Sequence, residues 1–217
     1  MNTLKIFSNS VSIANSKSKN YFDTEFIIGS FEPNENGDMV NRDTIENWLP
    51  TLLHTHLVGN IRKNVYGNFD FSDHEVSKIF VLDENGNQTE DYVLNTSGFG
   101  TCTKVEVRQI DNQEFIVATF RVFARYVNAF NLIKKRIING TLYSSWEIAI
   151  KQSHLENGIR VIDDGEFLSH CLLGSDVTPA CKDAMLLNVA SKQTERIEDI
   201  LLEDMERNGE LVKKKVS

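Results

Sequence analysis

A hydroxyl and a carboxylate stand two positions apart in the segment Ser144–Ile148, at Ser145 and Glu147. The segment has the composition of a buried strand. Because successive side chains of a strand point to opposite faces, Ser145 and Glu147 share one face and Trp146 lies on the other. A serine hydroxyl is a poor nucleophile unless an adjacent base accepts its proton. The pattern therefore predicts a hydrolase site, with Ser145 as the nucleophile.

His74 is the histidine that best fits the role of this base. It follows a glycine-bearing polar stretch, residues 67–73, and precedes an apolar run. We therefore expect His74 at a junction between a loop and a strand. A later turn contains Gly174 and Ser175, whose backbone amides could stabilise the negative charge that develops on a substrate carbonyl. We predict these two residues as the oxyanion hole.

Three segments carry a family resemblance through their order along the chain. They are the approach to the histidine, Gly67–Glu75, the serine strand, Ser145–Ile148, and the segment Leu173–Ala180. Together they resemble the capsid maturation (prohead) proteases of tailed bacteriophages, which are distant relatives of the herpesvirus assemblins. The resemblance covers roughly residues 57–187.

The resemblance implies a serine endopeptidase with an α+β fold, an antiparallel β-barrel flanked by helices. It implies that the protein acts inside the immature capsid in the host bacterial cytoplasm. Its substrates would be the scaffold protein, the major capsid protein and the protease itself, and self-association is one further expectation. No metal or cofactor is expected. The alternative is a catalytically inactive capsid assembly or scaffold protein with a degenerate protease domain.

Two residues compete for the third place in the catalytic group. Assemblins use a second histidine after the serine strand, and His170 occupies such a position in this chain. Glu147 matches a carboxylate of the phage motif and could orient His74 or favour its protonated form by Coulomb attraction. Both residues therefore remain catalytic candidates.

Other nucleophiles and bases stay open. His54 and His56 follow a predicted helix and are rival bases, and a serine–lysine mechanism would use Lys151 or Lys134. Cys171 is a further nucleophile candidate, although the apolar residues around it indicate burial.

The remaining sequence predicts the elements that would position these residues. Apolar alternation and turn signals predict strands at residues 21–31, 76–82, 92–94, 103–107, 114–122, 141–150, 159–162 and 166–173. Helical spacing predicts helices over residues 42–57 and 128–138 and an amphipathic helix after residue 191. Asp163-Asp164-Gly165 is predicted as a hairpin turn. We expect a protease domain over residues 1–187 and a C-terminal helix with a basic tail over residues 188–217.

Composition limits the classes of partner. The 217 residues contain 23 basic and 31 acidic side chains, which gives a net charge of −8. With no basic stripe along the chain, this balance disfavours nucleic acid as a ligand. No apolar run approaches the ~18 residues needed to cross a bilayer, so we expect no membrane partner and a cytosolic protein. Three cysteines with no paired metal-type spacing fit a reducing compartment.

Overall fold

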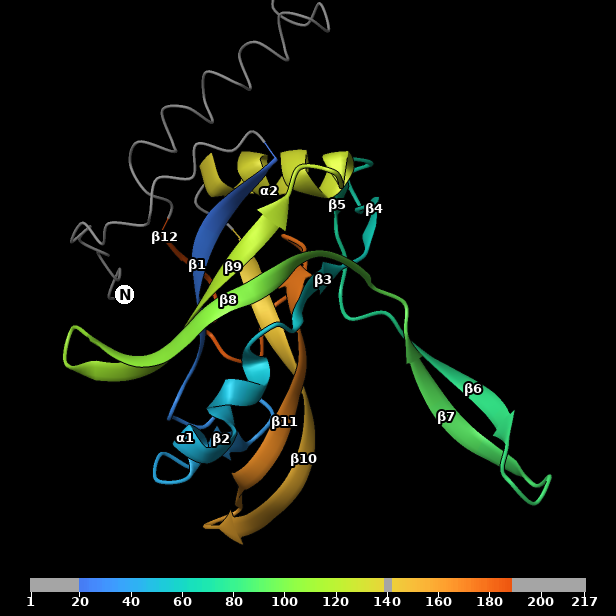
Figure 1. The fold of residues 1–217 in the computed structure, drawn as a ribbon, viewed down its shortest axis with the longest axis vertical. Coiled ribbons are helices and arrows are strands. Elements are labelled where there is room, and N and C mark those ends of the chain that lie inside the picture. Colours follow the sequence, from blue (N-terminus) through green and yellow to red (C-terminus); the bar gives the residue numbers. More distant parts are fainter. Residues whose placement is uncertain (1–19, 139–141, 189–217) are drawn as a thin grey trace, which may run out of the picture.

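The computed structural model describes residues 20–138 and 142–188. The largest unit of the fold is one strongly curved sheet of eight strands (Figure 1). Its strands are β1 (Tyr21–Ser30), β2 (Asp38–Val40), β3 (His56–Gly59), β8 (Ser97–Ile110), β9 (Gln113–Phe123), β10 (Tyr143–Glu156), β11 (Ile159–Leu173) and β12 (Leu186–Asn188). The order across the sheet is β10-β11-β3-β8-β9-β1-β12, and β2 also pairs with β11.

The predicted α+β fold with a helix-flanked barrel is wrong. The described part of the chain is mainly strand, and its sheet does not close into a barrel. β10 and β12 form the two ends of the strand order, and a single bridge from Tyr143 to Met185 connects these ends without a ladder. The predicted C-terminal helix lies outside the described residues.

Helices are few and short in the described ranges. They are α1 (Ile45–Trp48), a 3-10 turn (Leu49–Leu52) and α2 (Val127–Ile138). The long helix predicted over residues 42–57 is therefore wrong, and its apolar spacing belongs to a compact turn that buries Trp48 and Leu52. Pro50 lies in the first turn of the 3-10 segment, where a missing N–H costs little. None of the described helices is long and apolar enough to span a membrane.

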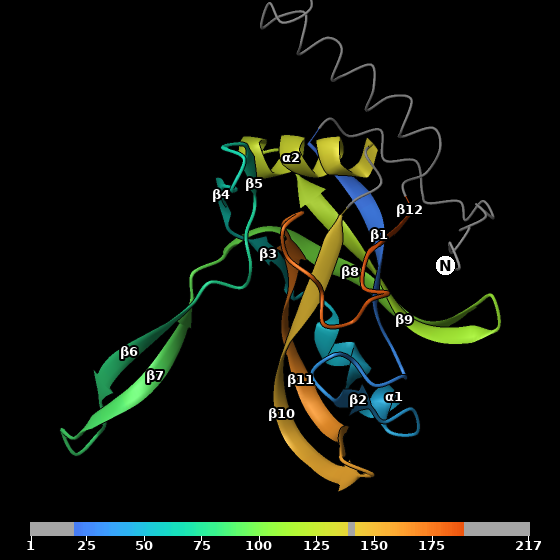
Figure 2. The same cartoon turned by 180° about the vertical axis from the view of Figure 1, so that it is seen from behind.

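α2 agrees closely with its prediction and packs on one end of the sheet. Figures 1 and 2 show it lying across the ends of β1 and β9. Ile133 is fully buried on its inner side, and the rings of Phe22 and Phe130 meet edge to face with centroids 5.0 Å apart. The concave side of the sheet is filled by large apolar side chains such as Phe26, Phe120 and Leu172. This core fixes the inner face of β10 and β11.

β10 and β11 form one long hairpin, and its turn lies at Asn157-Gly158, where both residues have positive φ. The predicted turn at residues 163–165 is wrong because these residues continue β11. An Asn-Gly pair suits the tight turn that joins two antiparallel strands, since both residues accept left-handed backbone geometry. The hairpin pairs the serine strand with its neighbour over its full length, with register shifts between Glu147 and Ile148 and on both sides of Gln152.

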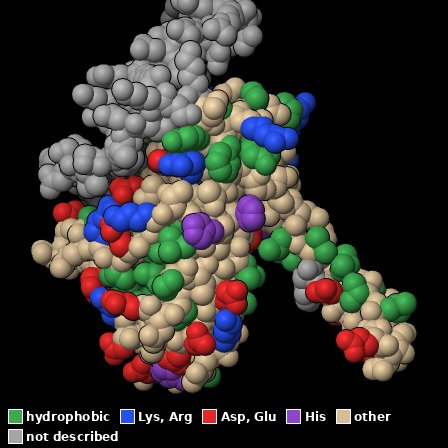
Figure 3. All heavy atoms as spheres, in the orientation of Figure 1, with side chains coloured by type: hydrophobic (Ala, Val, Ile, Leu, Met, Phe, Trp, Pro, Cys, Tyr) green, Lys and Arg blue, Asp and Glu red, His purple; other side chains and the backbone are tan. Residues whose placement is uncertain are grey.

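Two smaller hairpins leave the sheet between β3 and β8. β4 (Ile61–Lys63) pairs with β5 (Phe69–Phe71), and β6 (Val76–Leu82) pairs with β7 (Gln88–Leu94). The second hairpin projects from the body (Figures 1 and 2). Phe80 and Leu82 are exposed on it, and Figure 3 shows apolar side chains along its length with acidic ones near the far end.

One glycine is required by a close backbone approach beside β5. A Cβ on Gly174 would lie 2.1 Å from the carbonyl oxygen of Phe71 and 2.8 Å from Oδ1 of Asp176. We expect Gly174→Ala to lower the free energy of unfolding by about 2–4 kcal/mol, measured by urea denaturation, because the backbone must shift. Gly29→Ala is the control, since its Cβ would be an ordinary 3.6 Å from the Trp146 ring. Equal stability of the two variants would contradict this account of the turn.

Candidate active site

The register of β10 with β11 separates the candidate residues onto two faces. Ser145 is opposite Cys171, and Glu147 is opposite Ser169. These four side chains share the outer face of the hairpin because paired residues point to the same side of a sheet. Trp146 packs against the core on the inner face. Ser145 and Glu147 therefore share a face, as strand alternation predicts.

His74 lies in the connection between β5 and β6 and reaches the same outer face. The connection is held by backbone hydrogen bonds from Ser72 N to Asn60 O and from Gly174 N to Ser72 O. Oδ1 of Asp73 accepts a hydrogen bond from the His74 amide at 2.8 Å. The histidine therefore lies at the predicted junction between loop and strand.

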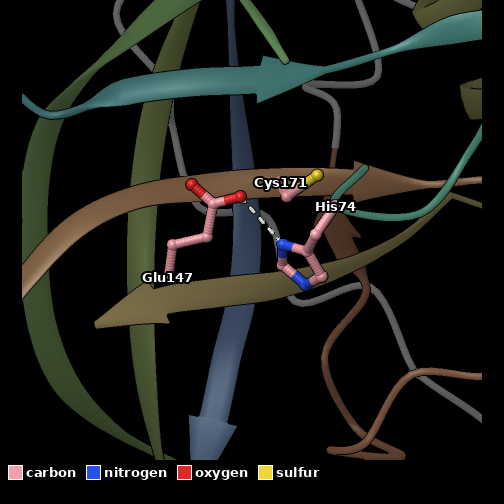
Figure 4. A group of neighbouring side chains, drawn as sticks. All are labelled: His74, Glu147 and Cys171. Atoms are coloured by element: carbon pink, nitrogen blue, oxygen red, sulfur yellow. Dashed lines mark hydrogen bonds and ion pairs between the residues drawn. The ribbon is translucent and has the colours of Figure 1, made fainter. Parts of the chain in front are cut away.

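A hydrogen bond joins His74 to Glu147 over 73 positions of sequence. His74 Nδ1 is 2.8 Å from Oε1 of Glu147, and the other carboxylate oxygen accepts a hydrogen bond from the Ser169 hydroxyl. The carboxylate is nearly buried, whereas a quarter of the His74 side chain is exposed. A carboxylate on Nδ1 favours the tautomer in which Nδ1 carries the proton and Nε2 is free to accept one. Figure 4 shows this arrangement, with Nε2 on the side of the ring away from the carboxylate.

The two neighbouring serines differ in their surroundings. Ser145 is half-buried, and its hydroxyl has no hydrogen-bond partner within the described ranges, His74 included. Catalytic hydrogen bonds are often long before substrate binds, so this geometry is compatible with a nucleophile. Ser144 is fully buried on the core side, and no described residue accepts or donates a hydrogen bond to its hydroxyl. Of the two, only Ser145 faces His74 and Glu147.

His170 is not part of this group. Its ring is fully buried in the core, stacked on Phe120 with centroids 5.2 Å apart and edge to face with Phe26. Neither ring nitrogen has a hydrogen-bond partner among the described residues. Burial lowers the pKa of His170 to about 3, with a smaller contribution from the charge of His74. The prediction of His170 as a third catalytic residue therefore fails on geometry.

The predicted oxyanion-hole amides already have acceptors in this structure. The Gly174 amide donates to Ser72 O at 3.3 Å, and the Ser175 amide donates to Oδ2 of Asp70 at 3.1 Å. Asp70 is buried and also accepts hydrogen bonds from the Ser175 hydroxyl and from Arg136 of α2. Burial alone would raise the pKa of Asp70, but these hydrogen bonds lower it below its usual value. Gly174 and Ser175 therefore hold the turn against β5, and their amides are not free for a substrate oxygen.

The rival bases lie away from Ser145. His56 shares the outer face but lies on β3, two strands from β10 and level with Glu147, or roughly 12 Å from Ser145. His54 lies in the preceding turn, where its amide donates to Cys102 O. Lys151 is six residues further along β10, roughly 20 Å from Ser145, and pairs with Glu166. Lys134 lies on α2 with its ammonium over the Phe130 ring.

Two further side chains belong to the site: Ser169, which no sequence pattern indicated, and Cys171, which the sequence indicated only as a rival nucleophile. Ser169 binds the second oxygen of Glu147, and the sulfur of Cys171 lies within 4.8 Å of the ligand atoms of His74 and Glu147. Burial raises the pKa of the Cys171 thiol, with added repulsion from Glu147 and Asp73, so a thiolate nucleophile is disfavoured. Correct pairing of β10 with β11 is the signal that would have identified both residues.

The buried His170 makes stability depend on pH. The unfolded chain protonates this ring near pH 6.5, whereas the folded chain does so only near pH 3, so the unfolded state binds more protons between these values. Stability therefore falls as the pH drops from 6.5 toward 3, by at most a few kcal/mol from this group. We expect His170→Phe to flatten this dependence and to preserve stability at pH 7.5, measured by urea denaturation across the pH range. The exposed histidine variant His56→Gln should keep the wild-type slope, and a wild-type slope in His170→Phe would contradict the assignment.

Comparison with known proteins places the chain in a family. The family model described as the YonD N-terminal domain matches residues 25–208, a range that contains His74, Ser145 and Glu147. Comparisons with curated proteins and with solved structures gave no match. Because the family match spans most of the sequence, the chain belongs to the YonD N-terminal domain family.

Proposed function

We propose that this protein is a serine endopeptidase in which Ser145 is the nucleophile, His74 the general base and Glu147 the residue that orients the base. The observation that carries the proposal is the 2.8 Å hydrogen bond from His74 Nδ1 to Glu147, made on the strand face that also bears Ser145. This is the relation between a base and its orienting carboxylate that nucleophilic hydrolases require. It is built from residues far apart in sequence, which argues against a local surface pairing.

The chemistry follows from the position of each group. Nε2 of His74 takes the Ser145 proton as the serine oxygen attacks the scissile carbonyl carbon. The imidazolium that forms is stabilised by the Glu147 carboxylate, which the Ser169 hydroxyl holds in place. His74 then gives the proton to the departing amine, and water hydrolyses the acyl-enzyme in a second cycle of the same base. Glu147 acts here as a positioning residue, since it contacts the base and not the substrate.

The substrate class in this proposal comes from the family resemblance of the three motif segments. The YonD N-terminal domain is phage-related, which agrees with substrates that are phage proteins. We infer that the natural substrates are segments of phage scaffold and major capsid protein, together with the chain itself. The site of action would be the interior of the immature capsid within the host bacterium. The alternative is a catalytically inactive capsid assembly or scaffold protein that keeps the fold. Labelling of the serine distinguishes this alternative from an active peptidase.

A serine-reactive fluorophosphonate tests the nucleophile directly. We expect one adduct on the full chain, located at Ser145 by intact mass and peptide mapping. Ser145→Ala should abolish labelling, and His74→Ala should slow it by roughly 10⁴-fold or more, because the hydroxyl loses its base. Glu147→Gln should give a smaller loss, since the base remains but its tautomer is no longer fixed.

Ser144→Ala is the matched control for these variants. It removes a buried hydroxyl that has no partner, so stability should be unchanged or higher and labelling should match the wild type. The same variants are then compared for cleavage of the chain itself and of the capsid protein on gels. Absence of any wild-type adduct and of any cleavage would refute the peptidase and favour an inactive assembly factor. Cleavage that survives Ser145→Ala would refute Ser145 as the nucleophile.

A further inference from the structure

Three side chains of different chemistry converge on the outer face of the β10–β11 hairpin. A ring nitrogen of His74, a carboxylate oxygen of Glu147 and the sulfur of Cys171 all lie within 4.8 Å of one another. They come from the loop before β6, from β10 and from β11, as Figure 4 shows. The peptidase mechanism uses the histidine and the glutamate but gives the thiol no role.

Imidazole nitrogen, carboxylate oxygen and thiolate sulfur are the three protein ligand types that zinc takes. In a tetrahedral zinc site with ordinary bond lengths, ligand atoms stand roughly 3.3–3.6 Å apart. The Cys171 sulfur would therefore have to approach the other two ligand atoms by at most about 1 Å, and the 2.8 Å contact between His74 and Glu147 would have to lengthen by roughly 0.5 Å. His74 belongs to a loop rather than to a ladder, so it can move. Glu147 and Cys171 are on adjacent paired strands, which hold two of the three ligands in place.

The surroundings of the group also favour a cation. A carboxylate oxygen of Glu147 lies within 4.8 Å of the Cys171 sulfur, so the group already holds a negative charge that attracts a cation. A divalent ion would stabilise the thiolate form of Cys171. The Ser169 hydroxyl already holds the second oxygen of Glu147, as outer-shell groups do in metal sites. The partly exposed His74 ring leaves a route from solvent.

We propose that His74, Glu147 and Cys171 form a binding site for Zn²⁺ with a fourth position open to water. On binding, Cys171 loses its thiol proton to solvent and forms the S–Zn bond. Nδ1 of His74 gives up its hydrogen bond to Glu147 and binds the ion, and the ring proton moves from Nδ1 to Nε2. One proton is released per ion, so the apparent affinity falls about tenfold for each pH unit below neutrality. The functional consequence rests on the proposed peptidase: an ion at this position removes the base from Ser145 and inhibits labelling reversibly.

Cobalt provides a direct test because it substitutes for zinc and absorbs when bound by a thiolate. We expect Co²⁺ added to the reduced full chain to give a thiolate-to-cobalt charge-transfer band at one equivalent, which Zn²⁺ then displaces. Cys171→Ser should remove the band, and His74→Ala should weaken binding at least about tenfold. Cys102→Ser and Cys181→Ser are the matched controls, since these free cysteines lie outside the group. Both should retain the band.

The two proposals fail in different ways. If the wild type gives no thiolate band, or if Cys171→Ser binds like the wild type, the metal site is refuted whatever the phosphonate shows. If the band behaves as expected but the metal-free protein takes no phosphonate, the metal site stands and the peptidase fails. If both proposals hold, Zn²⁺ should suppress phosphonate labelling of the wild type and of Cys102→Ser. In Cys171→Ser, the ratio of labelling with Zn²⁺ to labelling without it should stay near one. Zinc-insensitive labelling of the wild type would refute the inhibitory role.

Discussion

The hydrogen bond between His74 and Glu147 is the contact that makes a site out of two otherwise separate parts of this chain. One partner is on the β10–β11 hairpin at one end of the sheet, and the other is in the connection that leads to the projecting β6–β7 hairpin. The carboxylate is nearly buried, so its charge needs partners, and it obtains them from the histidine ring and from Ser169. The same bond selects the ring tautomer and leaves Nε2 available. Both the peptidase and the metal site depend on it.

A second polar cluster holds the histidine connection where this bond can form. Asp70, in β5, is buried and accepts hydrogen bonds from Arg136 of α2 and from Ser175 of the turn after β11. The predicted oxyanion loop therefore joins helix, strand and turn. Gly174 allows the turn to pass close to the Phe71 carbonyl. The position of the site is thus fixed by the packed inner face of the sheet and by the buried carboxylate of Asp70.

Local pattern was sufficient for much of the secondary structure and for the face shared by Ser145 and Glu147, because alternation depends only on the strand itself. It was insufficient wherever pairing decided the outcome. Counting back from the Asn157-Gly158 turn with a regular ladder would place His170 opposite Ser145. The structure instead pairs Ile148 with Phe167 and Glu147 with Ser169, which leaves Leu168 as an extra residue. That bulge moves His170 to the core and brings Ser169 and Cys171 to the site, and no sequence signal in β11 marks it. The open curved sheet likewise depends on long-range pairing.

The tautomer of His74 is the most direct measure of the central contact. Nitrogen-15 NMR of the histidine side chains, assigned by comparison with His74→Ala, reports which ring nitrogen carries the proton at neutral pH. The expected result is a protonated Nδ1 and an unprotonated Nε2 for His74, with the preference lost in Glu147→Gln. A His74 ring protonated at Nε2 in the metal-free protein, or a tautomer that is unchanged in Glu147→Gln, would contradict it.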